Sequence, residues 1–344
     1  MGNALVDIMI PIESDAILDM LSLPKGSMQL VDRERSASVL SALNGYKKSL
    51  SAGGSAANTI HGLAKLGAST GYIGVIGEDE LGGSFVRDLI QAGVEPHMIH
   101  SAQETGRAVA LVTPDSERTF ATFLGAAIEL SAEHLTPPAA KSTPPPAPPL
   151  EGKGVSSTRI AGGEAHPIFS KYQYFHIEGY LVQNHELIRR AVEIAKANGL
   201  IVSLDMASYN VVEANRDFLH EIIRKYVDIL FANEEEAAAF TGQRPEQAVH
   251  EISKFVEIAI VKTGSQGSLI KTTAEYCEIG VIPVQPIDTT GAGDLYAAGF
   301  LYGHSHGMTL QKCGELGALL AGNVIECMGS KMNEERWNRI LMEI

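Results

Sequence analysis

The sequence is poor in cysteine and in basic residues, and it has no long apolar run. It has three cysteines, an odd number that does not suit a disulfide framework, and no two of them form a Cys-x-x-Cys pair. The 27 lysines and arginines are outnumbered by 41 acidic residues, and the net charge of −14 argues against a nucleic-acid partner. No stretch approaches the roughly 18 apolar residues of a membrane span, and the amino terminus has no basic targeting region. We therefore expect a cytoplasmic protein with no membrane partner.

Several common active-site motifs are also missing or incomplete. The Gly-Lys pair at 152–153 is followed by Gly154, so it is not a GxxxxGK[ST] phosphate-binding loop. The GxGxxG motif that begins at Gly291 fails because Tyr296 stands in place of the third glycine. A GxSxG motif at 303–307 follows a segment that we predict to be a helix, whereas the hydrolase elbow needs a strand there. A dinucleotide oxidoreductase and a serine hydrolase are both unsupported.

The second half of the chain alternates short apolar strands with helices. Strands are predicted at 174–177, 200–204, 228–232 and 258–261, and helices at 185–197, 216–226, 234–240 and 245–255. This alternation is typical of an α/β fold in which helices cover both faces of a parallel sheet. Ligands of such sheets bind beyond the carboxyl ends of the strands.

The first third of the chain has a different pattern. Strands are predicted at 8–12, 29–31, 108–113 and 118–123, with helices at 56–66 and 79–91. We expect the strands to form a small antiparallel sheet, separate from the α/β body. Residues 136–166 are rich in proline and then in glycine and serine, which predicts an insertion at the surface.

The strongest local signal is the segment Asp288-Thr289-Thr290-Gly291-Ala292-Gly293-Asp294. Either threonine can cap a helix whose small first residues leave backbone N–H groups open to a phosphate, without a lysine or arginine. Asp294 lies in the same helical turn, where it can accept the proton of a substrate hydroxyl during phosphoryl transfer. The alternative is that Asp294 only stabilises the start of the helix.

A second motif is Ser51-Ala52-Gly53-Gly54-Ser55-Ala56-Ala57-Asn58. Its paired glycines allow a ligand to approach the backbone closely, and the Asn58 amide can both donate to and accept from a diol. A plain helix cap at Ser55 is the alternative interpretation.

Together the two motifs resemble the signatures of the ribokinase/PfkB carbohydrate kinase family, on its adenosine-kinase-like side. The resemblance covers the chain except 136–166. It implies one domain over 1–344: a ribokinase-like three-layer α/β/α body with a mostly parallel central sheet, and a small β lid from about 8–33 and 105–126. Members usually carry more residues before the Gly-Asn-Ala motif, so the first strand of the body is expected to be incomplete here.

The resemblance implies that the γ-phosphoryl group of Mg·ATP moves to a primary hydroxyl of adenosine or a related nucleoside. A kinase of ribose, fructose or another small carbohydrate is an alternative, and a non-catalytic nucleoside- or nucleotide-binding protein is a second one. The implied cofactors are ATP and Mg²⁺, with a monovalent cation such as K⁺ left open. Both a monomer and a homodimer remain open.

The resemblance also assigns roles to residues of this sequence. The base would be Asp294, and the anion hole would consist of the backbone of Gly291, Ala292 and Gly293. The acceptor would be bound by Asp7, Gly54 and Asn58, with Arg118 reaching toward the transferred phosphate. The ATP site would include Asn233, Glu236, Thr263, Gly264 and Gly267, and Glu236 would hold Mg²⁺ through water.

Several of these residues also have a purely structural interpretation. Asn233 is a good helix cap, and Thr263-Gly264 suits a simple turn. Arg118 can pair with Glu117 or with solvent. We expect Lys262 to be a solvated or sheet-edge charge. The lid residues Phe120 and Phe123 are candidates for stacking on a purine, although core packing explains them equally well.

Overall fold

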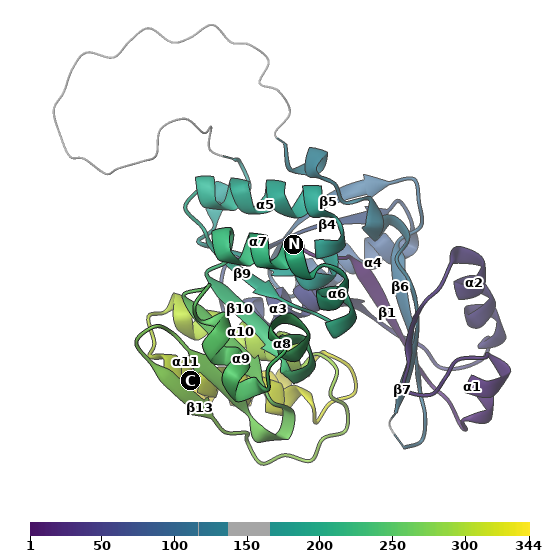
Figure 1. Ribbon diagram of the computed structural model, residues 1–344. Helices are drawn as coiled ribbons and strands as arrows, with labels where there is room; N and C mark the ends of the chain where they lie inside the picture. Colours follow the sequence, from purple (N-terminus) through teal and green to yellow (C-terminus); the bar gives the residue numbers. More distant parts are fainter. Residues whose placement is uncertain (116, 137–165) are drawn as a thin grey trace, which may run out of the picture.

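A six-stranded sheet forms the centre of the body in the computed structural model, which describes residues 1–115, 117–136 and 166–344 (Figure 1). In spatial order its strands are β13 (Tyr276–Ile279), β12 (Ser268–Lys271), β11 (Ile258–Lys262), β10 (Ile229–Asn233), β9 (Ile201–Asp205) and β8 (Tyr174–Glu178). The strands β8 to β11 are parallel, and β12 and β13 form an antiparallel edge. The predicted α/β body is confirmed.

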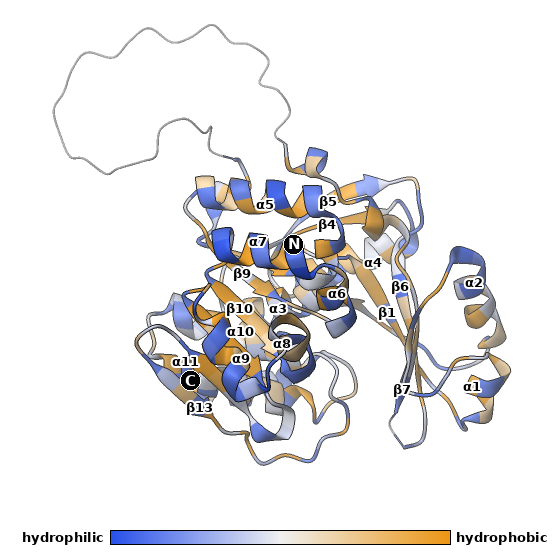
Figure 2. Ribbon diagram, in the orientation of Figure 1, coloured by the Kyte–Doolittle hydropathy of each residue, from blue (hydrophilic) through white to orange (hydrophobic). Residues whose placement is uncertain are grey.

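Helices cover both faces of this sheet, as the alternation of its apolar residues requires. On β10, Leu230 and Ala232 pack against α5 (His185–Ala197), α7 (Arg216–Tyr226), α8 (Glu234–Thr241) and α9 (Pro245–Ile252). Ile229 and Phe231 point the other way, toward α10 (Ala292–Ser305) and α11 (Leu310–Val324). The strand β10 is therefore apolar on both faces, and its ribbon is mostly orange in Figure 2.

Two further strands, β4 (Thr70–Gly77) and β5 (Val94–Ser101), pair in parallel beside the body, and the sequence did not predict them. The first two residues of the chain lie between this pair and β8. The Met1 amine donates to the His176 carbonyl (2.8 Å), the Glu178 amide donates to the Met1 carbonyl (3.1 Å), and the Gly2 amide donates to the Ile73 carbonyl (3.3 Å). Residues 1 and 2 therefore occupy the place where the incomplete first strand of the body was expected.

The first third of the chain forms a separate five-stranded sheet, which we call the lid sheet. Its spatial order is β2 (Met28–Leu30), β7 (Arg118–Phe123), β6 (Gly106–Val112), β1 (Leu5–Pro11) and β3 (Ser49–Gly53). The prediction that it is antiparallel is wrong in part, since β1 is parallel to β6 and β2 is parallel to β7. Long connections separate the members of both parallel pairs along the chain, as parallel pairing requires.

The two faces of the lid sheet have different partners. One face packs Ile8, Ile10 and Val109 against apolar residues of α1 (Ala16–Met20), α2 (Arg33–Ala42) and α4 (Glu80–Gln91). The other face carries Asp7, Ala108 and other residues of the cleft described below. In Figure 1, α1 and α2 lie on the far side of this sheet from the body.

Two other expectations can be compared with the structure, and a third falls outside the residues that it describes. The GxSxG motif lies at the end of α10 and in the turn after it, so the interpretation that it is not a hydrolase elbow is confirmed. Among the described residues, no helix is both long and apolar enough to cross a membrane. The predicted insertion lies almost entirely outside the described residues.

Candidate active site

A large cleft lies between the carboxyl ends of the body strands and the open face of the lid sheet. Its volume is about 1550 Å³, and its lining includes Asp7 and Thr122 from the lid sheet and Asp205, Glu236 and Asp294 from the body. Pockets for one small ligand usually hold about 300–1,000 Å³. The cleft therefore has room for two substrates.

Asp294 stands at the start of α10, on the wall of this cleft. Its Oδ1 accepts a hydrogen bond from Ser55 Oγ (2.7 Å), and its Oδ2 accepts one from Asn58 Nδ2 (2.9 Å). Burial raises the pKa of Asp294 to about 6, although these two hydrogen bonds act in the opposite direction. A carboxylate offers about four acceptor positions, so both oxygens can still accept from a substrate hydroxyl.

The turn before Asp294 faces the cleft in part: Gly293 lines it, whereas the Ala292 amide donates to the Thr289 carbonyl (3.2 Å). Gly291 caps α10 in the left-handed conformation (φ 75°), and no side chain caps the helix. The prediction that a threonine caps α10 is therefore wrong. A side chain at Gly291 would also collide with Ser330, since a Cβ there would lie 2.7 Å from the Ser330 Cβ. The uncapped N–H groups at this helix start are suited to bind a phosphate.

Lys262 lies beside the same turn, contrary to the prediction that it is solvated. Its Nζ would lie 3.0 Å from a Cβ at Gly293, and it forms an ion pair with Asp205 Oδ2 (2.8 Å). Burial lowers the pKa of Lys262, but the negative charges of Asp205 and Glu236 outweigh this effect and raise the pKa above its ordinary value. The anion hole thus has a cationic side chain at its edge.

The acceptor end of the cleft depends on the paired glycines. A Cβ at Gly53 would lie 2.3 Å from the Asp7 carboxylate, and a Cβ at Gly54 (φ 94°) would lie 2.4 Å from the Asn3 carbonyl oxygen. Burial raises the pKa of Asp7 to about 7, while Lys331 and Arg118 oppose this shift. Gly53 therefore leaves room for the buried Asp7 carboxylate at the wall of the cleft, and Gly54 allows the chain to pass close to Asn3.

The Asn58 side chain holds the Asp294 carboxylate in position. Its amide nitrogen donates to Asp294, and its Oδ1 accepts from Ser330 Oγ (2.9 Å). Both ends of the amide are therefore engaged within the protein. The predicted contact with a diol stays a prediction, and any such contact would use the remaining donor or lone pair of Asn58.

Glu178 and Asp205 are site residues that the sequence did not identify. Glu178 is almost fully buried and accepts hydrogen bonds from Asn3 Nδ2 (2.8 Å) and from the Ala56 amide (3.1 Å), and burial raises its pKa to about 7. Both acids lie at the last position of a body strand, as does Lys262. Since ligands bind beyond such strand ends, this position is the signal that could have found them.

The Asn233–Glu236 pair forms a reciprocal cap on α8. Asn233 Oδ1 accepts from the Glu236 amide (2.8 Å), while the Glu236 carboxylate accepts from the Asn233 amide and from Asn233 Nδ2 (both 2.8 Å). Glu236 is 3% exposed, and burial followed by repulsion from Asp205 raises its pKa to about 7. Both oxygens are already hydrogen-bonded, which fits contact with Mg²⁺ through water better than direct ligation.

The predicted nucleotide loop is only partly in the cleft. Gly264 lines it, whereas Thr263 and Gly267 close the tight turn between β11 and β12 behind it. Among the described residues no group of three acidic, histidine or cysteine side chains is arranged to hold a metal ion. A metal here would depend on phosphate and water for most of its ligands.

Residues 28–143 and 156–336 match the family described as pfkB family carbohydrate kinase. The chain belongs to this PfkB family. It is therefore an ATP-dependent kinase of the carbohydrate and nucleoside type, which phosphorylates a hydroxyl group.

Relatives of this PfkB kinase are similar along most of its length. A solved structure of a probable sugar kinase from Rhizobium etli is 31% identical, with a TM-score of 0.82, and covers 99% of this chain and 96% of its own. The adenosine kinase structure from Sinorhizobium meliloti is 30% identical, also with a TM-score of 0.82, and covers 100% and 98%. A nucleoside kinase of Methanocaldococcus jannaschii is 27% identical over 84% of each chain. The predicted ribokinase-like fold is confirmed.

Arg118 of the PfkB kinase does not extend into the cleft. It lies on β7 of the lid sheet, and its guanidinium contacts Asp288 and the Thr290 hydroxyl, next to the anion-hole turn. The alternative that it pairs with Glu117 or solvent is wrong, because the side chain is buried against the body. Phe120 lines the cleft, whereas Phe123 lies on the opposite face, beneath Arg107.

Proposed function

We propose that this kinase transfers the γ-phosphoryl group of Mg·ATP to the primary hydroxyl of adenosine or a related nucleoside. The observation that supports a nucleoside is a row of side chains across the open face of the lid sheet. Strand register places Asp7 beside Ala108, Ala108 beside Thr122, and Thr122 beside Leu30. At roughly 4.8 Å between strands, the row spans about 14 Å.

The two ends of this row differ in chemistry. Asp7 can accept hydrogen bonds from sugar hydroxyls, and it lies close to the proposed base. At the other end, Leu30 is 63% exposed, and Met28 and Phe120 lie beside it in the cleft. Exposed apolar side chains inside a cleft indicate a ligand with an apolar face. A nucleoside has a hydroxylated end and a flat base of this kind, whereas a free sugar would leave the apolar half of the row uncovered.

In the proposed reaction, Asp294 orients the acceptor hydroxyl and takes up its proton as the oxygen attacks the γ-phosphorus. The bond to the bridging oxygen of ATP breaks in line with this attack, and ADP leaves without a covalent phosphoenzyme. The N–H groups after Gly291 and the Lys262 ammonium would stabilise the negative charge on the transferred group. With its pKa of about 6, Asp294 is mostly ionised at neutral pH, as this role requires.

The acidic residues near the nucleotide end support a role for Mg²⁺. Bound with ATP, Mg²⁺ would neutralise charge on the β- and γ-phosphates. Asp205 and Glu236 would hold its water ligands, because both line the cleft and each carboxylate already accepts hydrogen bonds within the protein. The lid sheet would exclude water from the reacting groups and so prevent hydrolysis of ATP.

A small-carbohydrate kinase remains the second candidate, because Asp7 and the paired glycines suit any vicinal diol and the Rhizobium etli relative is described as a probable sugar kinase. A protein that binds without turnover fits less well, since Asp294 keeps both the hydrogen bonds and the anion-hole turn that catalysis needs.

The test is ADP release from Mg·ATP with adenosine, other nucleosides, ribose, fructose or no acceptor. We expect adenosine-dependent release, and a loss of about 10²- to 10⁴-fold in Asp294→Asn, the range for removal of a general base. Binding of ATP and acceptor should be retained in this variant. Release that depends on a free sugar alone would contradict the nucleoside proposal, and no acceptor-dependent release would favour a binding protein.

A further inference from the structure

The guanidinium of Arg118 connects the lid sheet to the carboxyl-terminal part of the chain. Its Nη1 donates to Thr290 Oγ1, and its Nη2 forms an ion pair with Asp288 and lies 3.8 Å from Met328 Sδ. The side chain is 7% exposed, and burial lowers its pKa to about 10, so it is still cationic at neutral pH. Asp288 and Thr290 lie about 170 residues away along the chain, and Met328 lies 210 residues away.

Asp288 is the junction between Arg118 and the anion hole. Its Oδ1 accepts from the Thr290 amide (2.9 Å), and its Oδ2 accepts from the Gly329 amide (2.5 Å). The next residue, Ser330, donates to Asn58, which in turn donates to the proposed base. A single buried carboxylate therefore holds the start of the anion-hole turn, the loop at 329–330 and the lid arginine.

We propose that Arg118 is a positioning residue for phosphoryl transfer, which acts through Asp288 to hold the turn 290–293 in its anion-binding form while the lid sheet lies against the body. The inference rests on phosphoryl transfer at Asp294 but is independent of the identity of the acceptor. It differs from the expectation that Arg118 reaches toward the transferred phosphate.

The burial of the pair favours action through Asp288 over direct contact with phosphate. To reach a phosphate in the cleft, Arg118 would have to leave Asp288, which is 6% exposed. Removing one partner of a buried ion pair leaves an uncompensated charge and is strongly unfavourable. The Arg118–Asp288 pair instead links β7 to the anion-hole turn, because the Asp288 carboxylate also accepts a hydrogen bond from the Thr290 amide.

A double-mutant cycle of Arg118→Met and Asp288→Asn distinguishes the two roles. We expect Arg118→Met to lower kcat by about tenfold or more in the wild-type background and to have no further effect once Asp288 is Asn, because the arginine then has no carboxylate to act on. An equal loss of kcat from Arg118→Met in both backgrounds would overturn the proposal and indicate a direct phosphate contact.

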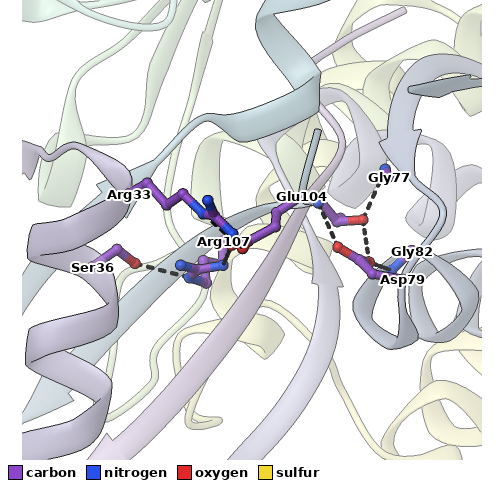
Figure 3. A network of polar contacts seen from close by, with 8 residues as sticks. Arg33, Ser36, Gly77, Asp79, Gly82, Glu104 and Arg107 are labelled. Carbon is purple, nitrogen blue, oxygen red and sulfur yellow. Dashed lines mark hydrogen bonds and ion pairs between the residues drawn. The ribbon is translucent and has the colours of Figure 1, made fainter. Parts of the chain in front are cut away.

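Arg107→Met is the matched control. Arg107 lies on the neighbouring strand β6, is 6% exposed, and pairs with Glu104 (2.9 Å) and Ser36 (2.8 Å), as Figure 3 shows. Neither of these partners belongs to the anion-hole turn or contacts Asp288, so we expect the loss of Arg107 to leave kcat unchanged. A fall in kcat similar to that of Arg118→Met would show that any buried lid arginine has this effect, and would overturn the proposal.

Two measures keep the cycle interpretable. If Arg118→Met does not fold, Arg118→Lys enters the same cycle, with thermal unfolding recorded for every variant. If the wild-type protein turns over no acceptor, the proposed function fails, and the cycle is measured instead by the affinity for adenylyl imidodiphosphate, a non-hydrolysable ATP analogue. The inference is supported if Arg118→Met lowers this affinity in the wild-type background but not in the Asp288→Asn background. An equal loss of affinity in both backgrounds contradicts it.

Discussion

Two buried arginines of the lid sheet illustrate how similar interactions serve different purposes. Arg107 and Arg118 lie on adjacent strands with nearly equal exposure, 6% and 7%, and each pairs with a carboxylate. The partners of Arg107 are Ser36 on α2 and Glu104 in the loop before β6 (Figure 3). The partner of Arg118 is Asp288, in the turn that would bind phosphate. The identity of the partner, and not burial or charge, decides which arginine can affect catalysis.

The network around Arg107 connects β6 and the loop before it to α2 and α4, two helices that pack on the lid sheet. Arg33 of α2 also pairs with Glu104, and the following residue, Thr105, donates from both its amide (2.7 Å) and its hydroxyl (2.6 Å) to Asp79. Asp79 is the cap of α4, where it accepts from the Gly82 amide (2.8 Å). Figure 3 shows these contacts as one continuous path from α2 to α4. Its role is therefore structural.

The largest effect that we expect from this comparison is on stability. Arg107→Met removes a charged hydrogen bond to Glu104 and leaves the Ser36 hydroxyl without its donor. The free energy of unfolding should fall by about 2 kcal/mol, within the range for hydrogen bonds to charged groups. Urea unfolding measures this change, and kcat at saturating substrates serves as the control. A stability equal to that of the wild type would show that the network contributes little.

The sequence predicted well those features that depend on neighbouring residues. The helices at 185–197 and 216–226 have the predicted bounds, because their apolar spacing and end residues are local signals. The strands β4 and β5 were missed, since Gly71, Gly74 and Gly77 interrupt the first and Pro96 interrupts the second. Glycine and proline weaken the strand pattern, although pairing in the folded protein overrides it.

In the candidate site, too, local features could be predicted from the sequence and features that depend on the fold could not. Asp294 and the Gly291 turn could be identified because their chemistry lies in one short segment. The pairing of Arg118 with Asp288 could not, because it depends on how the lid sheet packs against the body. Lys262 was misjudged for a related reason: an isolated lysine after a strand looks solvated until the fold places Asp205 beside it.

A smaller effect is expected at the acceptor end of the cleft. In Gly53→Ala the new Cβ would meet the Asp7 carboxylate at 2.3 Å, so Asp7 must move away from the acceptor. We expect the KM for the acceptor to rise about tenfold, since one weakened hydrogen bond to a charged group costs on the order of 1.5 kcal/mol. The KM for ATP should be unchanged. Steady-state kinetics with each substrate varied in turn measure both values.

Gly280→Ala is the control for this change, because a Cβ at Gly280 would meet no atom within 4 Å. It should leave both KM values unaltered. If Gly53→Ala instead raises the KM for ATP and leaves the KM for the acceptor unchanged, the acceptor does not bind at Asp7. The assignment of this end of the cleft to the acceptor would then be wrong.

The smallest expected effect is a shift in the pH dependence of kcat. Burial raises the pKa of Asp294 to about 6, and the hydrogen bonds from Asn58 and Ser55 counteract this rise. The rate should therefore fall as the pH drops through about 6, where the base becomes protonated. Ser55→Ala removes one hydrogen bond to the ionised form of Asp294, so the pKa of Asp294 should rise. The acidic limb of the kcat profile should then move to higher pH, by less than about one unit.

Thr59→Val is the matched control for this shift, because the Thr59 hydroxyl contacts the main-chain oxygen of Asp294 (3.2 Å) and not its carboxylate. The acidic limb should stay in place in this variant. A limb that moves to lower pH in Ser55→Ala, or moves equally in both variants, would show that the titrating group is not the Asp294 carboxylate. The nearby acids Asp7 and Glu178, whose pKa values burial raises to about 7, would then be the groups to replace next.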